Sequence, residues 1–115
     1  MTPFSATSTD EKTSKFVNAY KSKYGEVPNQ FAADAYDSVY AIHQALEKIG
    51  VNEDYDFDNI YDDMISQFTS MSFDGITGLS MTWASNGEVS KAPKAVIILN
   101  IAITKRDANN ILSML

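Results

Sequence analysis

The stretch FVNAYKSKYGEVPNQFAADAYDSVYAIHQAL, residues Phe16 to Leu46, decides the fold. It holds two segments whose apolar side chains recur at three- and four-residue spacing, the repeat of an amphipathic helix. Gly25 lies where a helix-ending glycine is expected, and Asn29 is a candidate N-cap for the segment that follows. The sequence therefore predicts two consecutive helices joined by a short turn.

Both helices carry further signals at their ends and along one side. Ser8 and Glu11 fit the S-x-x-E capping box, which would open the first helix. The second helix should end at Gly50, because a glycine commonly follows a helix C-terminus. A broad apolar stripe is expected to form its buried face. That stripe consists of Ala32, Ala35, Tyr36, Val39, Ile42, His43, Leu46 and Ile49.

A third helix is predicted over residues 57–68. Asp54 or Asp56 can cap it, and the surrounding acids suit the positive end of a helix dipole. The residues expected on its apolar side are Phe57, Ile60, Tyr61, Met64, Ile65 and Phe68.

After Met71 the apolar residues alternate at Leu79, Met81 and Trp83, as in a half-buried strand. Ser85-Asn86-Gly87 is a strong turn signal, and the second strand is expected over 95–102. Asp107 is a candidate cap for a short final helix. The fold class is therefore α/β, or α+β for the isolated chain: three amphipathic helices, a short strand-turn-strand and a C-terminal helix.

Composition narrows the range of functions. The chain has 115 residues, enough for one domain, and 44% of them are hydrophobic, as in globular proteins. A net charge of −6 argues against nucleic-acid binding, which requires a basic surface. Cysteine is absent, which excludes disulfides and thiolate sites. The opening residues MTPFSATST lack the basic and apolar regions of a signal peptide, and no apolar run is long enough to span a bilayer.

Few residue patterns indicate chemistry. Asp54, Asp56 and Asp58 have the D-x-D-x-D spacing that opens a calcium loop, but Ile65 stands where such a loop needs its closing glutamate. A capped acidic helix start is the favoured interpretation. His43 is the only histidine, and its spacing suggests no catalytic or metal partners. We therefore expect no catalytic residues, no metal and no cofactor.

Two further pairs of residues have ordinary structural explanations. Asp34 and Asp37 flank Tyr36 and are expected to lie on a solvated helix face, although paired carboxylates can also perform acid–base chemistry in a cleft. Gly75 and Gly78 belong to no phosphate-binding pattern and are expected to permit a tight backbone turn.

A second stretch, FDGITGLSMTWASNGEVSKAPKAVIIL, follows at residues Phe73 to Leu99. In this order the two stretches resemble the C-terminal third of an extracellular solute-binding protein of the branched-chain amino acid (Leu/Ile/Val) ABC transporter family. The resemblance covers roughly Thr2 to Leu99, so residues 1–99 are expected to be part of one lobe of the type I periplasmic-binding-protein fold. Residues 100–115, NIAITKRDANNILSML, resemble nothing in the family and form a divergent tail.

The resemblance implies a function as well as a fold. Family members close two lobes on an amino acid or similar small polar solute and deliver it to an ABC permease. The implied location is extracellular or periplasmic, with a possible lipid anchor in the longer parent protein. Two alternatives remain open: a ligand-sensing receptor domain of the same fold, and a self-associating structural fragment without ligand. Because its elements lack the family's sheet, the chain is expected to form a homo-oligomer.

The resemblance also suggests site residues. The stretch matching Asn29 to Tyr36 begins a helix that borders the family's cleft, which makes Phe31 and Asp34 candidate ligand-binding residues. An ordinary first-turn role for both is an equal alternative. Thr2 to Ser5 resembles an interlobe hinge segment, and Phe73 to Gly78 resembles the family's structural F-x-G-x-T-G turn.

Overall fold

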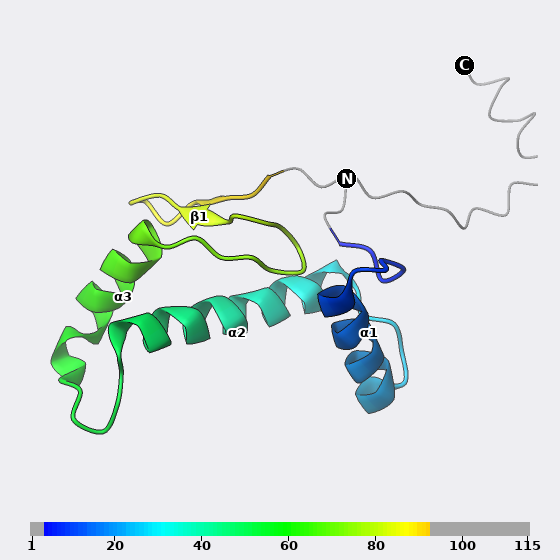
Figure 1. The fold of residues 1–115 in the computed structure, drawn as a ribbon, viewed down its shortest axis with the longest axis horizontal. Coiled ribbons are helices and arrows are strands. Elements are labelled where there is room, and N and C mark those ends of the chain that lie inside the picture. Colours follow the sequence, from blue (N-terminus) through cyan, green and yellow to red (C-terminus); the bar gives the residue numbers. More distant parts are fainter. Residues whose placement is uncertain (1–3, 93–115) are drawn as a thin grey trace, which may run out of the picture.

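A computed structural model describes residues 4–92, which form three α-helices, one 3₁₀ turn and one two-stranded sheet (Figure 1). In chain order these are α1 (Glu11–Tyr24), α2 (Gln30–Ile49), η1 (Phe57–Asn59), α3 (Ile60–Ser70), β1 (Thr82–Trp83) and β2 (Val89–Ser90). α1 lies at one end of the long helix α2 and α3 at the other, with the hairpin alongside (Figure 1). The expected mixture of three helices and a small sheet is thus confirmed. The strand expected over 95–102 and the helix expected from Asp107 lie outside the described residues.

Helix α1 begins two residues later than the capping box predicts. Asp10 is its N-cap, and the Asp10 carboxylate accepts hydrogen bonds from the backbone N–H of Thr13 at 2.9 Å and from its hydroxyl at 2.5 Å. Ser8 instead accepts a hydrogen bond from Asp10 N. The capping-box prediction at Ser8 and Glu11 is therefore wrong, because an aspartate nearer the helix provides a stronger acceptor for the same free N–H groups.

The turn from α1 to α2 follows the sequence closely. Gly25 ends α1 with a φ of 76°, a left-handed conformation that favours glycine. The side chain of Asn29 accepts a hydrogen bond from Ala32 N at 3.0 Å and so caps α2. Gly50 ends α2 with a φ of 78°. These three predictions are confirmed.

The buried face of α2 differs from the predicted stripe. The buried residues are Ala33, Asp37, Ala41 and Ala45, which share one side of the helix at four-residue spacing. Val39, on the predicted stripe, is 66% exposed. The three alanines of this face pack in the same clusters as Met71, Phe73 and Ile76, which follow α3 in the chain. The prediction of the buried face is therefore wrong, and apolar side chains of α2 remain at the surface.

The third helix starts in 3₁₀ form rather than as a continuous α-helix. Asp56 opens it by accepting a hydrogen bond from Asp58 N at 3.1 Å, which confirms one of the two predicted caps. Met64 and Phe68 pack against a core cluster. The expected apolar side is only half correct, because Phe57, Tyr61 and Ile65 are exposed.

The hairpin forms at the predicted turn but pairs earlier than predicted. Thr82 pairs with Ser90 and Trp83 with Val89, and Gly87 in the turn has a φ of 86°. The partner strand of this hairpin is therefore β2, which corrects the expectation that the strand following the turn would begin at Ala95.

Two clusters of buried side chains hold these elements together. The first joins the segment before α1, helix α1 and the start of α2, and consists of Phe4, Phe16, Val17, Ala33 and Ile76. The second lies between the later part of α2 and the hairpin, and consists of Ala41, Ala45, Met71, Phe73 and Met81. The loop from Phe73 to Gly78 contributes to both clusters, so its conformation positions both ends of α2.

Candidate functional site

The N-terminal end of α2 brings together polar groups from distant parts of the chain. Gln30, its first residue, accepts a hydrogen bond from Phe4 N at 3.1 Å and donates one to Asp34 Oδ1 at 3.1 Å. Because one amide side chain makes both contacts, the segment before α1 is tied to the first turns of α2.

Phe31 and Asp34, the two candidate ligand-binding residues, lie one turn apart here. The side chain of Phe31 is 80% exposed, although burial of an aromatic ring is strongly favourable. Asp34 is partly buried, and one of its carboxylate oxygens remains in contact with Gln30. An exposed aromatic ring therefore stands beside a carboxylate held in a fixed position.

Lys91 completes this group, although no sequence pattern indicated it. Its ammonium lies 3.4 Å from Asp34 Oδ1 and donates a hydrogen bond to Thr77 Oγ1 at 2.8 Å. Lys91 is 57 residues from Asp34 and comes directly after β2. Only the folding of the hairpin onto α2 brings the two charges together.

Asp37 has a structural role that the sequence did not predict. It is only 4% exposed and accepts hydrogen bonds from Ile76 N at 2.9 Å, Thr77 N at 2.8 Å and Thr77 Oγ1 at 2.6 Å. The expectation of a solvated Asp37 is therefore wrong. The carboxylate compensates its own burial by satisfying the backbone donors of the 73–78 turn.

This contact also explains Gly75. A Cβ at this position would lie 2.3–2.6 Å from the carboxylate atoms of Asp37, so only glycine permits the approach. The expected tight turn is confirmed, and Gly75 N donates to Gly78 O at 2.9 Å. Glycine is required at position 75 because the Asp37 side chain is so close, and not because of a positive φ.

A small hollow of about 200 Å³ lies between α2 and the hairpin, next to the charged pair. Asp34, Ser38 and Lys91 provide its polar side, whereas Phe73, Met81 and Trp83 are among its apolar residues. A carboxylate, an ammonium group and an apolar wall are the groups that a small zwitterion with an apolar side chain would contact.

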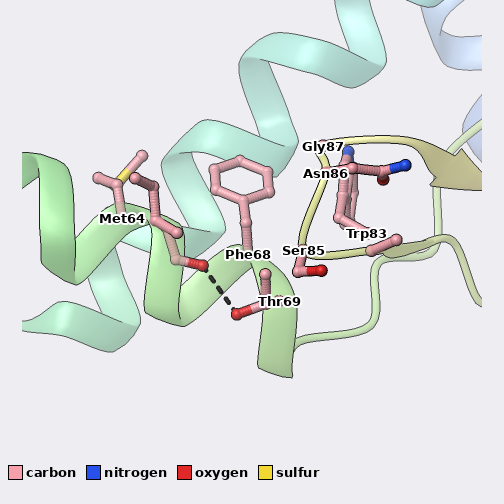
Figure 2. A pocket seen from close by; sticks show the side chains of 9 residues that line it. Met64, Phe68, Thr69, Trp83, Ser85, Asn86 and Gly87 are labelled. Carbon is pink, nitrogen blue, oxygen red and sulfur yellow. Dashed lines mark hydrogen bonds between the residues drawn. The ribbon is translucent and has the colours of Figure 1, made fainter.

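Two larger hollows are mainly apolar. The first, of about 390 Å³, separates α3 from the hairpin, with Met64 and Phe68 on one side and Trp83 to Gly87 on the other (Figure 2). The second, of about 540 Å³, lies between α1 and α2. We call this second hollow the tyrosine groove. Its lining includes Lys15, Tyr20, Lys23, Tyr24, Tyr36 and Tyr40.

The remaining polar candidates have structural partners. Asp56 accepts hydrogen bonds from Asp58 N and from the Asn59 side chain, in agreement with the favoured interpretation of a capped acidic helix start. The exposed His43 lies 3.6 Å from Glu47 on the same helix. Within residues 4–92, no three His, Cys, Asp or Glu side chains gather closely enough to hold a metal ion.

The start of α2 thus carries a carboxylate, an ammonium group and an exposed aromatic ring. The buried Asp37 stabilises the 73–78 turn next to them. The family model of the periplasmic binding proteins matches residues 1–98, and the chain belongs to this family. No curated protein and no solved structure matches the chain.

Family membership indicates a solute-binding role, without catalysis, and a periplasmic location. Among the helices of the described part of the chain, none is long and apolar enough to cross a membrane.

Proposed function

We propose that this chain forms part of a lobe that binds an amino acid or a similar small polar solute for import by an ABC transporter. The observation that supports this most directly is the arrangement of Asp34 and Lys91 beside the exposed Phe31. A free amino acid carries one ammonium and one carboxylate, so a carboxylate and an ammonium 3.4 Å apart offer a partner to each.

The proposal assigns different roles to the three residues. Asp34 would accept hydrogen bonds from the ammonium of the solute, and Lys91 would donate to its carboxylate. Phe31 would cover the apolar part of the solute, because an exposed ring at the surface can bury its face on binding. The type I lobe, with residues 1–99 as its part and residues 100–115 as a separate tail, belongs to the same proposal, as does an ABC permease as partner.

Lobe closure gives the mechanism. The Gln30 side chain links this surface to Phe4, in the segment that would connect the lobes. A solute that binds the closed arrangement more tightly shifts the population toward it, in a hinge motion about that segment.

A thermal-shift screen of the chain against the common amino acids, with leucine, isoleucine and valine included, tests the proposal. A solute present at about a hundred times its dissociation constant adds roughly 2.7 kcal/mol of stability. At this chain length the melting temperature should then rise by roughly ten degrees. Cooperative melting with no shift for any amino acid would contradict solute binding by this chain.

A further inference from the structure

Within residues 4–92, the tyrosine groove is an unfilled aromatic surface between two helices. On α1, the rings of Tyr20 and Tyr24 are 4.6 Å apart, and on α2 those of Tyr36 and Tyr40 are 4.7 Å apart. Tyr24 and Tyr40 are exposed, while burial raises the pKa of Tyr36 to about 12. The groove therefore has a partly buried base at Tyr36 and open aromatic edges that would gain contacts from a partner.

Charge is divided between the two ends of α2. Helix α1 carries four lysines and one glutamate, a net charge of +3, and Lys15 and Lys23 line the groove. The stretch from residue 47 to residue 63 holds seven acids and one lysine, a net charge of −6. The chain therefore presents a basic end and an acidic end.

The acidic end also exposes apolar side chains. Phe57, Tyr61 and Ile65 follow one another at four-residue spacing and are all exposed, Tyr61 by 81%. Asp58 and Asp62, each one residue further along the chain, are exposed as well. Phe57 and Asp58 belong to η1, and the other three residues belong to α3. We call these five residues together the acidic face of α3. An apolar stripe flanked by carboxylates is the form in which a helix docks into a groove flanked by cations.

We propose that the acidic face of α3 in one copy docks into the tyrosine groove of a second copy. The two surfaces are complementary in charge and both are apolar at their centre, so association brings lysines to aspartates and buries the exposed rings. This inference does not depend on solute binding, because it uses none of the residues assigned to the solute.

Within one chain, the acidic face of α3 cannot reach the tyrosine groove. α1 and α3 lie at opposite ends of α2 (Figure 1), and a helix of 20 residues is about 30 Å long. The contact is therefore head-to-tail, and the described part of each copy keeps one groove and one acidic face open for further association. The assembly should grow with concentration and weaken as salt screens the charges.

Sedimentation velocity on the chain over a range of micromolar concentrations, at low and at physiological salt, measures this association. We expect species larger than the monomer that increase with concentration and decrease with salt. Lys23→Glu should raise the concentration needed for association by about tenfold, the scale of one lost interface contact. Lys21→Glu is its matched control, because it makes the same charge change in the same turn of α1 but does not line the groove.

The apolar part of the contact has a control of its own. Tyr61→Ser should weaken association by about tenfold or more. Phe31→Ser removes an equally exposed ring elsewhere on the surface and should leave association unchanged. At concentrations low enough for the chain to be monomeric, circular dichroism and melting temperature should be unaffected by either change, since neither ring is buried.

A charge exchange gives the decisive measurement. The double variant K15E/K23E and the double variant D58K/D62K should each be monomeric alone, whereas an equimolar mixture should associate. A wild-type chain that stays monomeric at all concentrations and salts would overturn the proposal. It would also be overturned by a mixture that fails to associate, or by equal effects of Lys23→Glu and Lys21→Glu.

Discussion

A Cβ atom on Gly75 would lie 2.3 Å from Oδ2 of Asp37. The carboxylate cannot move aside freely, because it accepts three hydrogen bonds from the turn that contains Gly75. The Asp37 carboxylate thus fixes helix α2 to the 73–78 turn, and this contact is possible because Gly75 has no side chain.

Gly75→Ala should therefore destabilise the chain. The added methyl group either breaks hydrogen bonds to Asp37 or pushes the turn away from α2, at a cost of about 1–3 kcal/mol. Urea unfolding followed by circular dichroism measures the loss.

The matched control for this substitution is Gly78→Ala. A Cβ at Gly78 meets its nearest neighbour, Met81, at 3.4 Å, which is close to ordinary contact, and Gly78 has no positive φ. An equal loss of stability in both variants would contradict the role given to the Asp37 contact.

Asp37→Ala should be more damaging than any substitution at an exposed acid. It leaves the N–H groups of Ile76 and Thr77 buried without their acceptor, and an unsatisfied buried group costs roughly 1–3 kcal/mol. We expect a loss of roughly 3 kcal/mol in the free energy of unfolding.

Asp34→Ala is the comparison for Asp37→Ala. Its ion pair with Lys91 is partly exposed, so its loss should cost less than about 1 kcal/mol. Similar free energies of unfolding for the two variants would show that the buried acceptor is unimportant.

The stability of the chain should fall in strongly alkaline solution because of Tyr55. The hydrogen bond from its hydroxyl to Asp63 raises the pKa of Tyr55 to about 12, against an ordinary value of about 10. The neutral hydroxyl is thus favoured in the folded chain. Its contribution to stability is present below about pH 10 and is lost as the pH rises to about 12.

Denaturant unfolding at several alkaline pH values, compared between wild type and Tyr55→Phe, measures this contribution. The difference between the two proteins should shrink across that interval, because phenylalanine cannot ionise. In Asp63→Asn, absorbance titration should show Tyr55 ionising closer to its ordinary pKa. A constant stability difference across the alkaline range would refute the assignment.

The helix ends were predictable from the sequence because their causes are local. Gly25 and Gly50 adopt left-handed conformations at the predicted positions. Asn29 caps α2 by accepting a hydrogen bond from the backbone N–H of Ala32, only three residues along the chain. The start of α1 was missed only because Asp10 and Ser8 compete for the same helix end, and a sequence pattern does not rank them.

The buried face of α2 was not predictable in the same way. The helix is apolar around more than one side, so its period does not say which side faces the core. The deciding contacts, between Asp37 and Thr77 and between Asp34 and Lys91, join residues 40 and 57 positions apart. Such contacts depend on how the hairpin folds back onto α2, and no local sequence pattern predicts that.

Substitutions at the candidate solute site should separate binding from stability. Phe31→Ala should leave the melting temperature unchanged, because the ring is largely exposed, yet weaken binding of an amino acid by about tenfold. Lys91→Met should weaken binding by a similar factor, because the solute carboxylate loses its cation. Isothermal titration calorimetry with the amino acid that gives the largest thermal shift measures both changes. Val39→Ala, an exposed position further along α2, is the control and should bind as the wild type does. If Phe31→Ala and Lys91→Met also bind normally, the solute contacts other residues, and the start of α2 has the first-turn structural role that its sequence equally allows.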